Sequence, residues 1–363
     1  MKIKLIKSTF VTAMKHVQNV TSKKPTLQIV ANVHMVAKDN ELTLTATDLD
    51  VSCIAKVACE VVEEGATTLP ARLLLLALQK MPEGEVVIDS NMNDIAKVVA
   101  GNSTYNINGL PAKDFPALPV IEDPDKYTLP QVTLREMFRK VVYATSKDET
   151  RRTLKGVLMS FKDGKLTMVG TDGRRLSLIE YGLETNGNDH DIILPPNAIG
   201  EVVSSLGTDG DCEIAIEGCQ VSFTMGNVKV YSKLIDDMYP NYGQVIPKNN
   251  DKSCKIDRAM FAEAIDRVAI FSDAATNATV KFSLKDGEMT ITSATQDVGD
   301  AKDIIPVKFD GELEILFNPF YILDVLKAID DDEVDFVFNN GSSPVIIKCS
   351  VPFLGVVMPV RIN

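Results

Sequence analysis

The segment VLMSFKDGKLTMVGTDGRRLS, residues 157–177, alternates apolar and polar side chains around the dipeptide Asp163-Gly164. An Asp-Gly pair between two such runs is typical of a two-residue β-hairpin turn, in which both residues adopt positive φ. The pairs Asp39-Asn40 and Asp286-Gly287 have the same position in two other alternating segments. The sequence therefore predicts three hairpins of one kind.

These hairpins belong to a longer repeat. Threonines follow the hairpins at intervals of 124 and 124 residues: Thr47, Thr171 and Thr295. Residues that can cap a helix through a side-chain oxygen precede them at the same intervals: Thr9, Thr133 and Asp257. Thr133 with Glu136 also fits a capping box. A repeat of this length is a full domain rather than a solenoid unit.

Each repeat is expected to contain two helices. Behind each cap, apolar residues coincide in the three copies: Ala13/Met137/Phe261, Val17/Val141/Ile265 and Val20/Ala144/Val268. Their spacing of four and then three residues predicts an amphipathic helix. The segments RLLLLALQKM, NAIGEVVSSL and FYILDVLKAI predict the second helix of each copy. The expected helices thus span 7–20, 71–81, 133–146, 196–206, 257–271 and 319–331.

We therefore predict an α+β protein of three repeated domains, at 1–125, 126–253 and 254–363, each with helices against antiparallel sheet. Two unrelated α+β domains are the alternative, but they would not explain so many spacings in one frame. Three equal domains in a row favour an arc, and arcs that associate head to tail can close into a ring.

Composition limits the classes of function. Hydrophobic residues make up 45% of the 363 residues, and no apolar run is long enough for a membrane span. The six cysteines form no C-x-x-C pair, so we expect free thiols and a cytoplasmic location without membrane contact. The net charge of −12 argues against a protein that coats nucleic acid with its whole surface. Any contact with DNA must be local, weak or enforced by shape.

Four motifs carry a resemblance to a known family: LPAKDFPALP at 110–119, GTDGRRLS at 170–177, YPNYGQVIP at 239–247 and VVMPVRIN at 356–363. Together they resemble the bacterial sliding clamps, the β subunits of DNA polymerase III. The resemblance implies a DNA clamp fold in which a homodimeric ring is lined by helices, with sheets outside. It implies a processivity factor without catalysis, cofactor or metal. Its partners would be double-stranded DNA, bound without sequence preference, and the polymerase III catalytic subunit, the clamp loader and other replication and repair proteins.

In this family a groove between the second and third domains binds a short linear motif of such client proteins. The matching residues in this chain are Leu154, Thr171, Gly173, Arg174, Arg175, Leu176, Pro240, Val245, Asn318, Tyr321, Val345, Met358, Pro359, Val360 and Arg361. Arg174 replaces a frequent His, and Gln244 stands where a basic residue is common, so the preferred peptide can differ. For Leu154, packing in the core is an equally good interpretation.

Basic residues on the expected helices are candidates to face DNA. The first three helices carry a charge of +6 (seven Lys and Arg against Glu136), and the last three carry −4. Lys24 and Arg72 match basic positions of the family, and the helix charges add Lys15, Lys80, Arg135 and Arg139. Ordinary solvated helix faces would account for any single one of these cations.

Ring closure would join the first domain of one copy to the third domain of the other. By resemblance, Tyr105 and Ile107 would face Ile270 and Phe271 of the partner. Burial of Phe271 in the core of its own domain is the competing interpretation.

Two rival classes of protein remain. An enzyme is disfavoured because the sequence lacks the common nucleotide-binding, hydrolase and metalloprotease motifs. Asp172 could serve as a general base, but turn chemistry explains it better. A monomeric scaffold would share the groove and lack the ring. Sedimentation and retention on circular as opposed to linear DNA would separate these classes.

Overall fold

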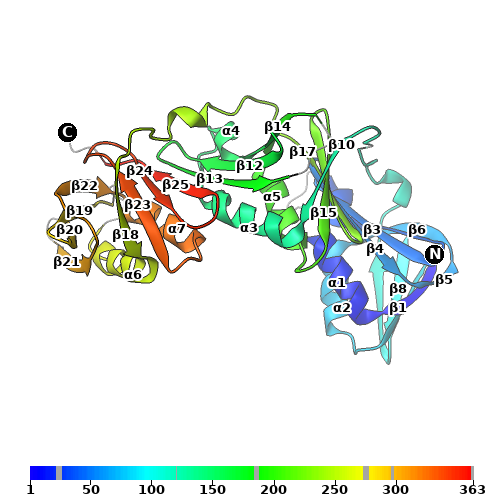
Figure 1. Ribbon diagram of the computed structural model, residues 1–363. Helices are drawn as coiled ribbons and strands as arrows, with labels where there is room; N and C mark the ends of the chain where they lie inside the picture. The colour runs from blue at the N-terminus through cyan, green and yellow to red at the C-terminus, as the bar shows by residue number, and fades with distance from the viewer. Residues whose placement is uncertain (22–26, 120, 184–187, 273–277, 296–297, 361–363) are drawn as a thin grey trace. The chain divides into compact units, whose positions relative to one another are not determined.

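The computed structural model describes residues 1–363 except 22–26, 120, 184–187, 273–277, 296–297 and 361–363 (Figure 1). The described residues form two compact units. The first unit consists mainly of 1–135 and 194–234, and the second of 136–183, 189–193 and 235–360. None of the helices in the described part of the chain is long and apolar enough to cross a membrane.

The first unit contains two antiparallel sheets. The five-stranded sheet has the order β5 (Glu60–Glu63), β1 (Lys2–Ile6), β7 (Glu85–Ser90), β8 (Ile95–Ala100), β9 (Ser103–Asn108). The eight-stranded sheet has the order β10 (Asp125–Pro130), β15 (Asp211–Glu217), β16 (Gln220–Met225), β17 (Val228–Lys233), β4 (Val51–Ala58), β3 (Glu41–Thr47), β2 (Asn32–Lys38), β6 (Gly65–Pro70). Its helices are α1 (Lys7–Gln18), α2 (Ala71–Lys80) and α5 (Pro196–Ser205). Helix α3 (Gln131–Val141) begins in this unit and ends in the second.

The second unit repeats this plan. Its eight-stranded sheet has the order β14 (His190–Leu194), β11 (Val157–Lys162), β12 (Lys165–Thr171), β13 (Arg175–Gly182), β25 (Phe353–Val357), β24 (Val345–Lys348), β23 (Glu333–Phe338), β18 (Lys252–Asp257). The four-stranded sheet has the order β21 (Gly299–Pro306), β20 (Glu288–Thr295), β19 (Val280–Lys285), β22 (Leu313–Phe317). The helices are α4 (Arg152–Lys155), α6 (Arg258–Ala269) and α7 (Pro319–Ala328).

The middle repeat contributes four strands to each eight-stranded sheet. Its strand β17 pairs with β4 of the first repeat, from Val228 opposite Ala55 to Ser232 opposite Val51. Its strand β13 pairs with β25 of the third repeat, from Arg175 opposite Val357 to Ile179 opposite Phe353. Successive repeats therefore share continuous sheets, and each compact unit contains part of the middle repeat.

The structure confirms the three hairpin turns. Both turn residues have positive φ in each case: 52° and 57° at Asp39-Asn40, 53° and 68° at Asp163-Gly164, 53° and 82° at Asp286-Gly287. The flanking strands pair directly across two-residue loops, as Lys162 opposite Lys165 illustrates. The local sequence therefore determines these turns.

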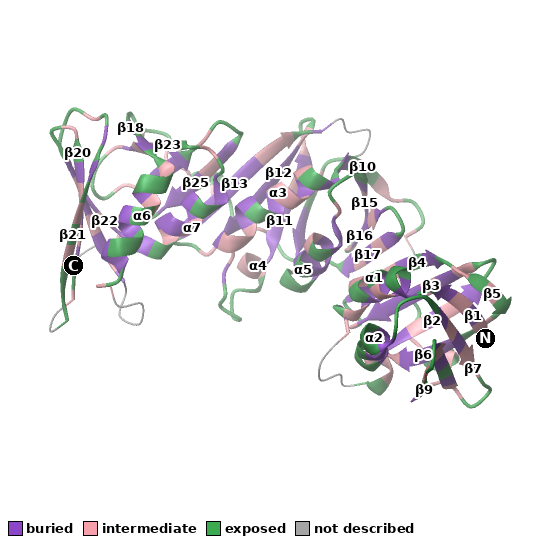
Figure 2. Cartoon of the chain, turned by 90° about the horizontal axis from the view of Figure 1, so that it is seen from below, coloured by how far each residue is buried: buried purple, intermediate pink, exposed green. Residues whose placement is uncertain are grey.

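All six expected helices are present, and their predicted apolar positions are buried. The outer faces of α1, α2 and α6 are exposed (Figure 2). Several helices end earlier than predicted; α3, for example, changes to a 3₁₀ turn at Val142–Ala144. The short helix α4 was not predicted from the sequence.

Two of the three expected caps are wrong. Asp257 does cap α6, accepting a hydrogen bond from Met260 N at 2.7 Å. Thr9 and Thr133 lie inside their helices, because α1 begins at Lys7 and α3 at Gln131. There the first helical N–H group donates to a backbone carbonyl of a distant loop, Lys7 N to Gly84 O at 2.9 Å and Gln131 N to Gly210 O at 3.0 Å. The first N–H group of α6 is held in the same way, by Asp332 O at 2.8 Å, so α6 has this tertiary contact in addition to its side-chain cap.

A lone carboxylate is buried in the first unit. Helix α5 packs against β17 and β4, and its Glu201 is only 7% exposed. Burial and the nearby carboxylate of Asp48 raise the pKa of Glu201 to about 7. Among the described residues, Glu201 Oε2 and the hydroxyls of Ser205 and Ser222 have no hydrogen-bond partner. The first unit therefore contains buried polar groups that are not satisfied by other protein atoms.

The protonation of Glu201 predicts a pH dependence of stability. Between its ordinary pKa of 4.5 and about 7, the folded chain holds a proton that the unfolded chain has released. The free energy of unfolding therefore falls as pH rises through this range, by about 3 kcal/mol. The variant Glu201→Gln should lose most of this dependence, measured as the difference in urea midpoint between about pH 5 and pH 8. Glu63→Gln, which changes an exposed glutamate, is the control, and equal pH dependence in both variants would contradict the assignment.

Candidate functional site

The loop that joins β12 to β13 is held by its own side chains. Thr171 Oγ1 donates to Arg175 O at 2.6 Å and accepts from Gly173 N at 3.1 Å. Asp172 Oδ1 accepts from the backbone N of Arg174 and Arg175, at 2.8 and 3.0 Å. Gly173 has φ +83°, a conformation that side chains disfavour. The turn interpretation of Asp172 is confirmed, since its carboxylate fixes the loop.

Arg175 is buried, and its guanidinium forms hydrogen bonds within its own chain. Its guanidinium donates to Asp172 Oδ2 at 3.1 Å, to Asp324 Oδ2 at 2.5 Å and to Tyr143 O at 2.7 Å. It also lies 5.5 Å from the ring centroid of Tyr143 and 4.7 Å from that of Tyr321. Arg175 therefore ties the loop to α7 and to the end of α3. Three of its five N–H donors are thus used within the chain, and this placement supports a positioning role.

One cavity brings together six of the expected groove residues. It has a volume of about 270 Å³ and is lined by Arg174, Asn318, Tyr321, Met358, Pro359 and Val360, with Ala278. The tail that supplies three of these residues is held by backbone hydrogen bonds, from Met358 N to Arg174 O at 2.9 Å and from Val360 N to Leu316 O at 2.8 Å. Its apolar tail and its arginine suit an extended peptide, which needs both side-chain and backbone contacts.

A second cavity, of about 440 Å³, is also lined by Arg174 and Tyr321. The Arg174 guanidinium donates to the Tyr321 hydroxyl at 3.5 Å, which raises the pKa of Arg174. Sequence reasoning missed other residues of this cavity, among them Lys147, Arg151 and Phe320. Phe320 directly precedes the expected Tyr321 in the sequence, and this position was the signal that could have identified it.

The remaining groove residues are more dispersed. Leu176 and Val345 are almost fully buried, so they belong to the sheet core and not to an open wall. Leu154 is half-buried, and Pro240 and Val245 are exposed on the segment that follows β17. Arg361 lies outside the described residues.

Only some of the Lys and Arg side chains that were expected to face DNA are exposed and without a partner in the described part of the chain. Lys15, Arg72 and Lys80 are exposed on α1 and α2, whereas Lys24 lies outside the described residues. Arg135 donates to Leu206 O, and Arg139 pairs with Glu136 at 2.6 Å and with Asp330.

Two further cations of the helix count are not available to contact DNA. Lys7 and Lys140 are buried, and each is paired within the chain, to Glu83 at 2.8 Å and to Asp330 at 3.3 Å. Side-chain pairing across distant segments is not visible in a count along the sequence. Four of the seven counted cations are therefore engaged by the chain itself.

The residues expected at the seam between copies differ in exposure. Ile270 is 78% exposed, and Tyr105 is exposed on β9. Ile107 is 4% exposed, which places it in the core of its own unit, and Phe271 is half-buried. Sequence reasoning missed other exposed apolar residues, among them Leu73 and Leu76 on α2 and Ile304 on β21. Their positions on the outer faces of a helix and an edge strand were the available signal.

Among the described residues, no group of three or more His, Cys, Asp or Glu side chains could hold a metal ion. All six cysteines are free thiols, as expected, and three of them are buried.

The network around Arg175 should be important for the stability of the second unit. Arg175→Met removes the cation and leaves Asp172 and Asp324 without their partner, so we expect a loss of about 3 kcal/mol in the free energy of unfolding. Urea unfolding measures this loss. Arg152→Met, at an exposed arginine of α4, is the control and should change stability by less than about 0.5 kcal/mol. An equally small change in both variants would show that the buried network is dispensable.

Three family models match nearly the whole chain. They are described as the N-terminal domain (residues 1–119), the central domain (128–241) and the C-terminal domain (243–361) of the DNA polymerase III beta subunit. These matches agree with a fold of three related domains.

Similar proteins extend over the same length. The beta sliding clamps of Chlamydia muridarum and Rickettsia bellii are each 31% identical and covered over 100% of both chains. The crystal structure of the DNA polymerase sliding clamp from Bacillus subtilis has a TM-score of 0.96 at 27% identity, and that of the DNA polymerase III subunit beta from Pseudomonas aeruginosa 0.95 at 29%. Both structures are matched over 100% of each chain. With its three α+β domains, this chain belongs to the family of DNA polymerase III beta subunits, the beta sliding clamps.

Proposed function

We propose that two copies of this chain close into a ring around duplex DNA and hold DNA polymerase III and other client proteins on it. Sliding clamps are processivity factors and not enzymes, so this function requires no catalytic residue. Relatives that are DNA polymerase clamps and subunits support DNA and the polymerase as partners. The same proposal places the protein in the cytoplasm, where replication takes place in bacteria.

Exposed apolar residues near two sheet edges carry the proposal of ring closure. Strand β9 lies at one end of the five-stranded sheet, and β21 lies at one end of the four-stranded sheet. An edge strand presents unpaired N–H and C=O groups that can pair with another chain. We expect β9 of one copy to pair with β21 of the other, with Tyr105 and Ile270 beside the seam. Two identical seams follow, because a symmetric dimer uses each of its two surfaces once per copy.

The proposed contact with DNA is weak. The exposed cations Lys15, Arg72 and Lys80 can approach phosphates, whereas the chain as a whole carries −12. Each phosphate neutralised by a cation adds salt-sensitive affinity, and phosphate contacts contain no sequence information. A ring that slides needs few such contacts.

The proposed client site is the pair of cavities beside Arg174. The smaller cavity is lined by the apolar tail residues Met358 and Val360, and the larger one is lined by Lys147 and Phe320. Together they offer apolar surface, aromatic rings and free donors along one path. The polymerase catalytic subunit, the clamp loader and repair proteins would bind here in turn through a short linear motif.

The seam can be tested with Ile270→Asp, which places a charge at an exposed apolar position. We expect monomers by sedimentation, and a protein that no longer stays on nicked circular DNA. Met92→Asp, at a residue that is 98% exposed in the β7–β8 turn, is the matched control and should leave the dimer intact. A dimer of undiminished mass in the Ile270 variant would refute the seam.

The client site can be tested by removing residues 358–363. This deletion takes away the tail side of the smaller cavity, so binding of a polymerase-derived peptide should weaken by tenfold or more, measured by fluorescence anisotropy. Sedimentation should still report a dimer, because the tail lies on other strands than the proposed seam. Unchanged peptide affinity in the truncated protein would exclude this site.

A further inference from the structure

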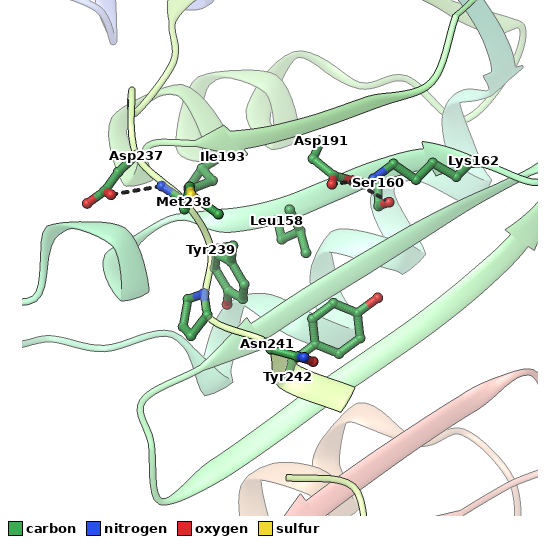
Figure 3. Close-up of a pocket in the computed structure, with 11 residues that line it drawn as sticks. Leu158, Ser160, Lys162, Asp191, Ile193, Asp237, Met238, Tyr239, Asn241 and Tyr242 are labelled. Carbon is green, nitrogen blue, oxygen red and sulfur yellow. Dashed lines mark hydrogen bonds and ion pairs between the residues drawn. The ribbon is translucent and has the colours of Figure 1, made fainter. Parts of the chain in front are cut away.

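A third cavity, of about 380 Å³, lies on the outer side of β11 and β14 (Figure 3). The segment Asp237–Tyr242 crosses these two strands and covers it. In Figure 3, Asp237 lies at one end of the cavity, and Asp191 with Lys162 lies at the other. None of the residues of this cavity except Pro240 belongs to the expected groove.

The floor of this cavity is apolar and its walls are aromatic. Leu158 and Ile193 form the floor and belong to the same buried cluster as Leu176 of the groove loop. Tyr239 and Tyr242 contribute rings that pack on this cluster. The Tyr239 hydroxyl donates to Val169 O at 3.3 Å, which fixes its ring in place.

The carboxylates at the two ends differ in their partners. Asp191 accepts from the Ser160 hydroxyl at 2.6 Å and pairs with Lys162 at 2.5 Å, so its charge is matched. Asp237 accepts from the Thr153 hydroxyl at 2.7 Å and from Met238 N at 2.8 Å. These hydrogen bonds, the Thr153 hydroxyl first, lower the pKa of Asp237. Within the described part of the chain, Asp237 forms no ion pair, and Arg152 contributes to the lower pKa of Asp237 through a weaker charge interaction.

We propose that this cavity binds a lysine or arginine side chain of a client peptide, next to the residues that enter the main groove. The aliphatic stem would lie on Leu158 and Ile193, and the cation would reach the face of a tyrosine ring and the carboxylate of Asp237. Aromatic faces and carboxylates both attract cations, and a long stem covers apolar surface.

A client peptide is the expected occupant because the cavity shares Pro240 with the groove expected from the family resemblance. Pro240 lines the cavity and Val245 lies on the same segment, and both belong to the expected client site. Leu158, Ile193 and Leu176 share one buried apolar cluster, so the same core supports the cavity floor and strand β13, which follows the groove loop. This inference rests on the proposed function, since it assigns a flanking residue of the same client.

The experiment uses the full-length protein and a labelled peptide from the polymerase III catalytic subunit. The peptide is extended at one end or the other by Arg, Gln or Glu, and affinities are measured by anisotropy. Arg at one end only should increase affinity about fivefold over Gln, and Glu should weaken binding. Asp237→Asn should reduce this gain to less than about twofold, and Asn241→Lys, which places a competing cation in the cavity, should abolish it.

Asp310→Asn, at an exposed carboxylate between β21 and β22, is the matched control and should retain the full gain. Equal affinity of the Arg and Gln peptides would overturn the inference, and so would a gain at both ends, which would reflect only the charge of −12. If the unextended peptide fails to bind, the proposed client site fails instead. The two failures are therefore distinguishable.

Discussion

The pairing of β13 with β25 is the constraint on which the candidate site depends. It sets Arg175 opposite Val357, and the bond from Met358 N to Arg174 O continues the pairing into the tail. A loop of the middle repeat and the C-terminal segment thereby become neighbours. The cavity beside Arg174 exists because these two segments meet, and a shift of this register by one residue would turn the tail side chains to the opposite face.

The two places where successive repeats share a sheet use one backbone turn and different side chains. Thr47 and Asp48 in the first repeat bind backbone groups as Thr171 and Asp172 do in the second: Thr47 Oγ1 donates to Val51 O at 3.0 Å, and Asp48 Oδ1 accepts from Val51 N at 2.7 Å. At the position of Arg175, however, the first repeat has Val51. The helix carboxylate that corresponds to Asp324 is Glu201, which therefore lacks an arginine. One junction contains an ion network, and the other contains a carboxylate whose pKa is raised to about 7. A buried carboxylate is tolerated as an anion when it is paired, and without a partner it takes up a proton more readily.

The sequence predicts whatever is decided locally. Positive φ is required in the three hairpin turns, at Asp39-Asn40, Asp163-Gly164 and Asp286-Gly287. Asp, Asn and Gly are the residue types that most readily adopt it, so the sequence predicts these turns. The helices follow from apolar spacing, and their buried stripe was correct at each predicted position. Thr9 and Thr133 were wrong as caps because α1 and α3 begin two residues earlier, at Lys7 and Gln131. The first N–H groups of these helices donate to carbonyls in distant loops, which no local sequence pattern records.

The same limit applies to the candidate site. Motif matching located Arg174, Tyr321 and Met358, which do line one cavity. It could not tell that Leu176 and Val345 are covered by the sheet, nor that Arg175 is committed to Asp324 and Tyr143. The cavity behind Tyr239 was also missed, because its carboxylates and rings come from two segments that only the fold brings together.

The distribution of charge favours a protein that stays on DNA by enclosing the duplex over one that stays on it by electrostatic binding. Of the cations counted on the first three helices, Lys7, Arg135, Arg139 and Lys140 are engaged by groups of the same chain, and three remain exposed. The affinity of a protein for DNA falls steeply with salt and rises with the number of phosphates that it neutralises. The small number of free cations on these helices, together with the net charge of −12, favours weak electrostatic contact with DNA. In the proposed ring, long residence on DNA comes from enclosure of the duplex. The exposed apolar residues near β9 and β21 offer the contact that would close this ring.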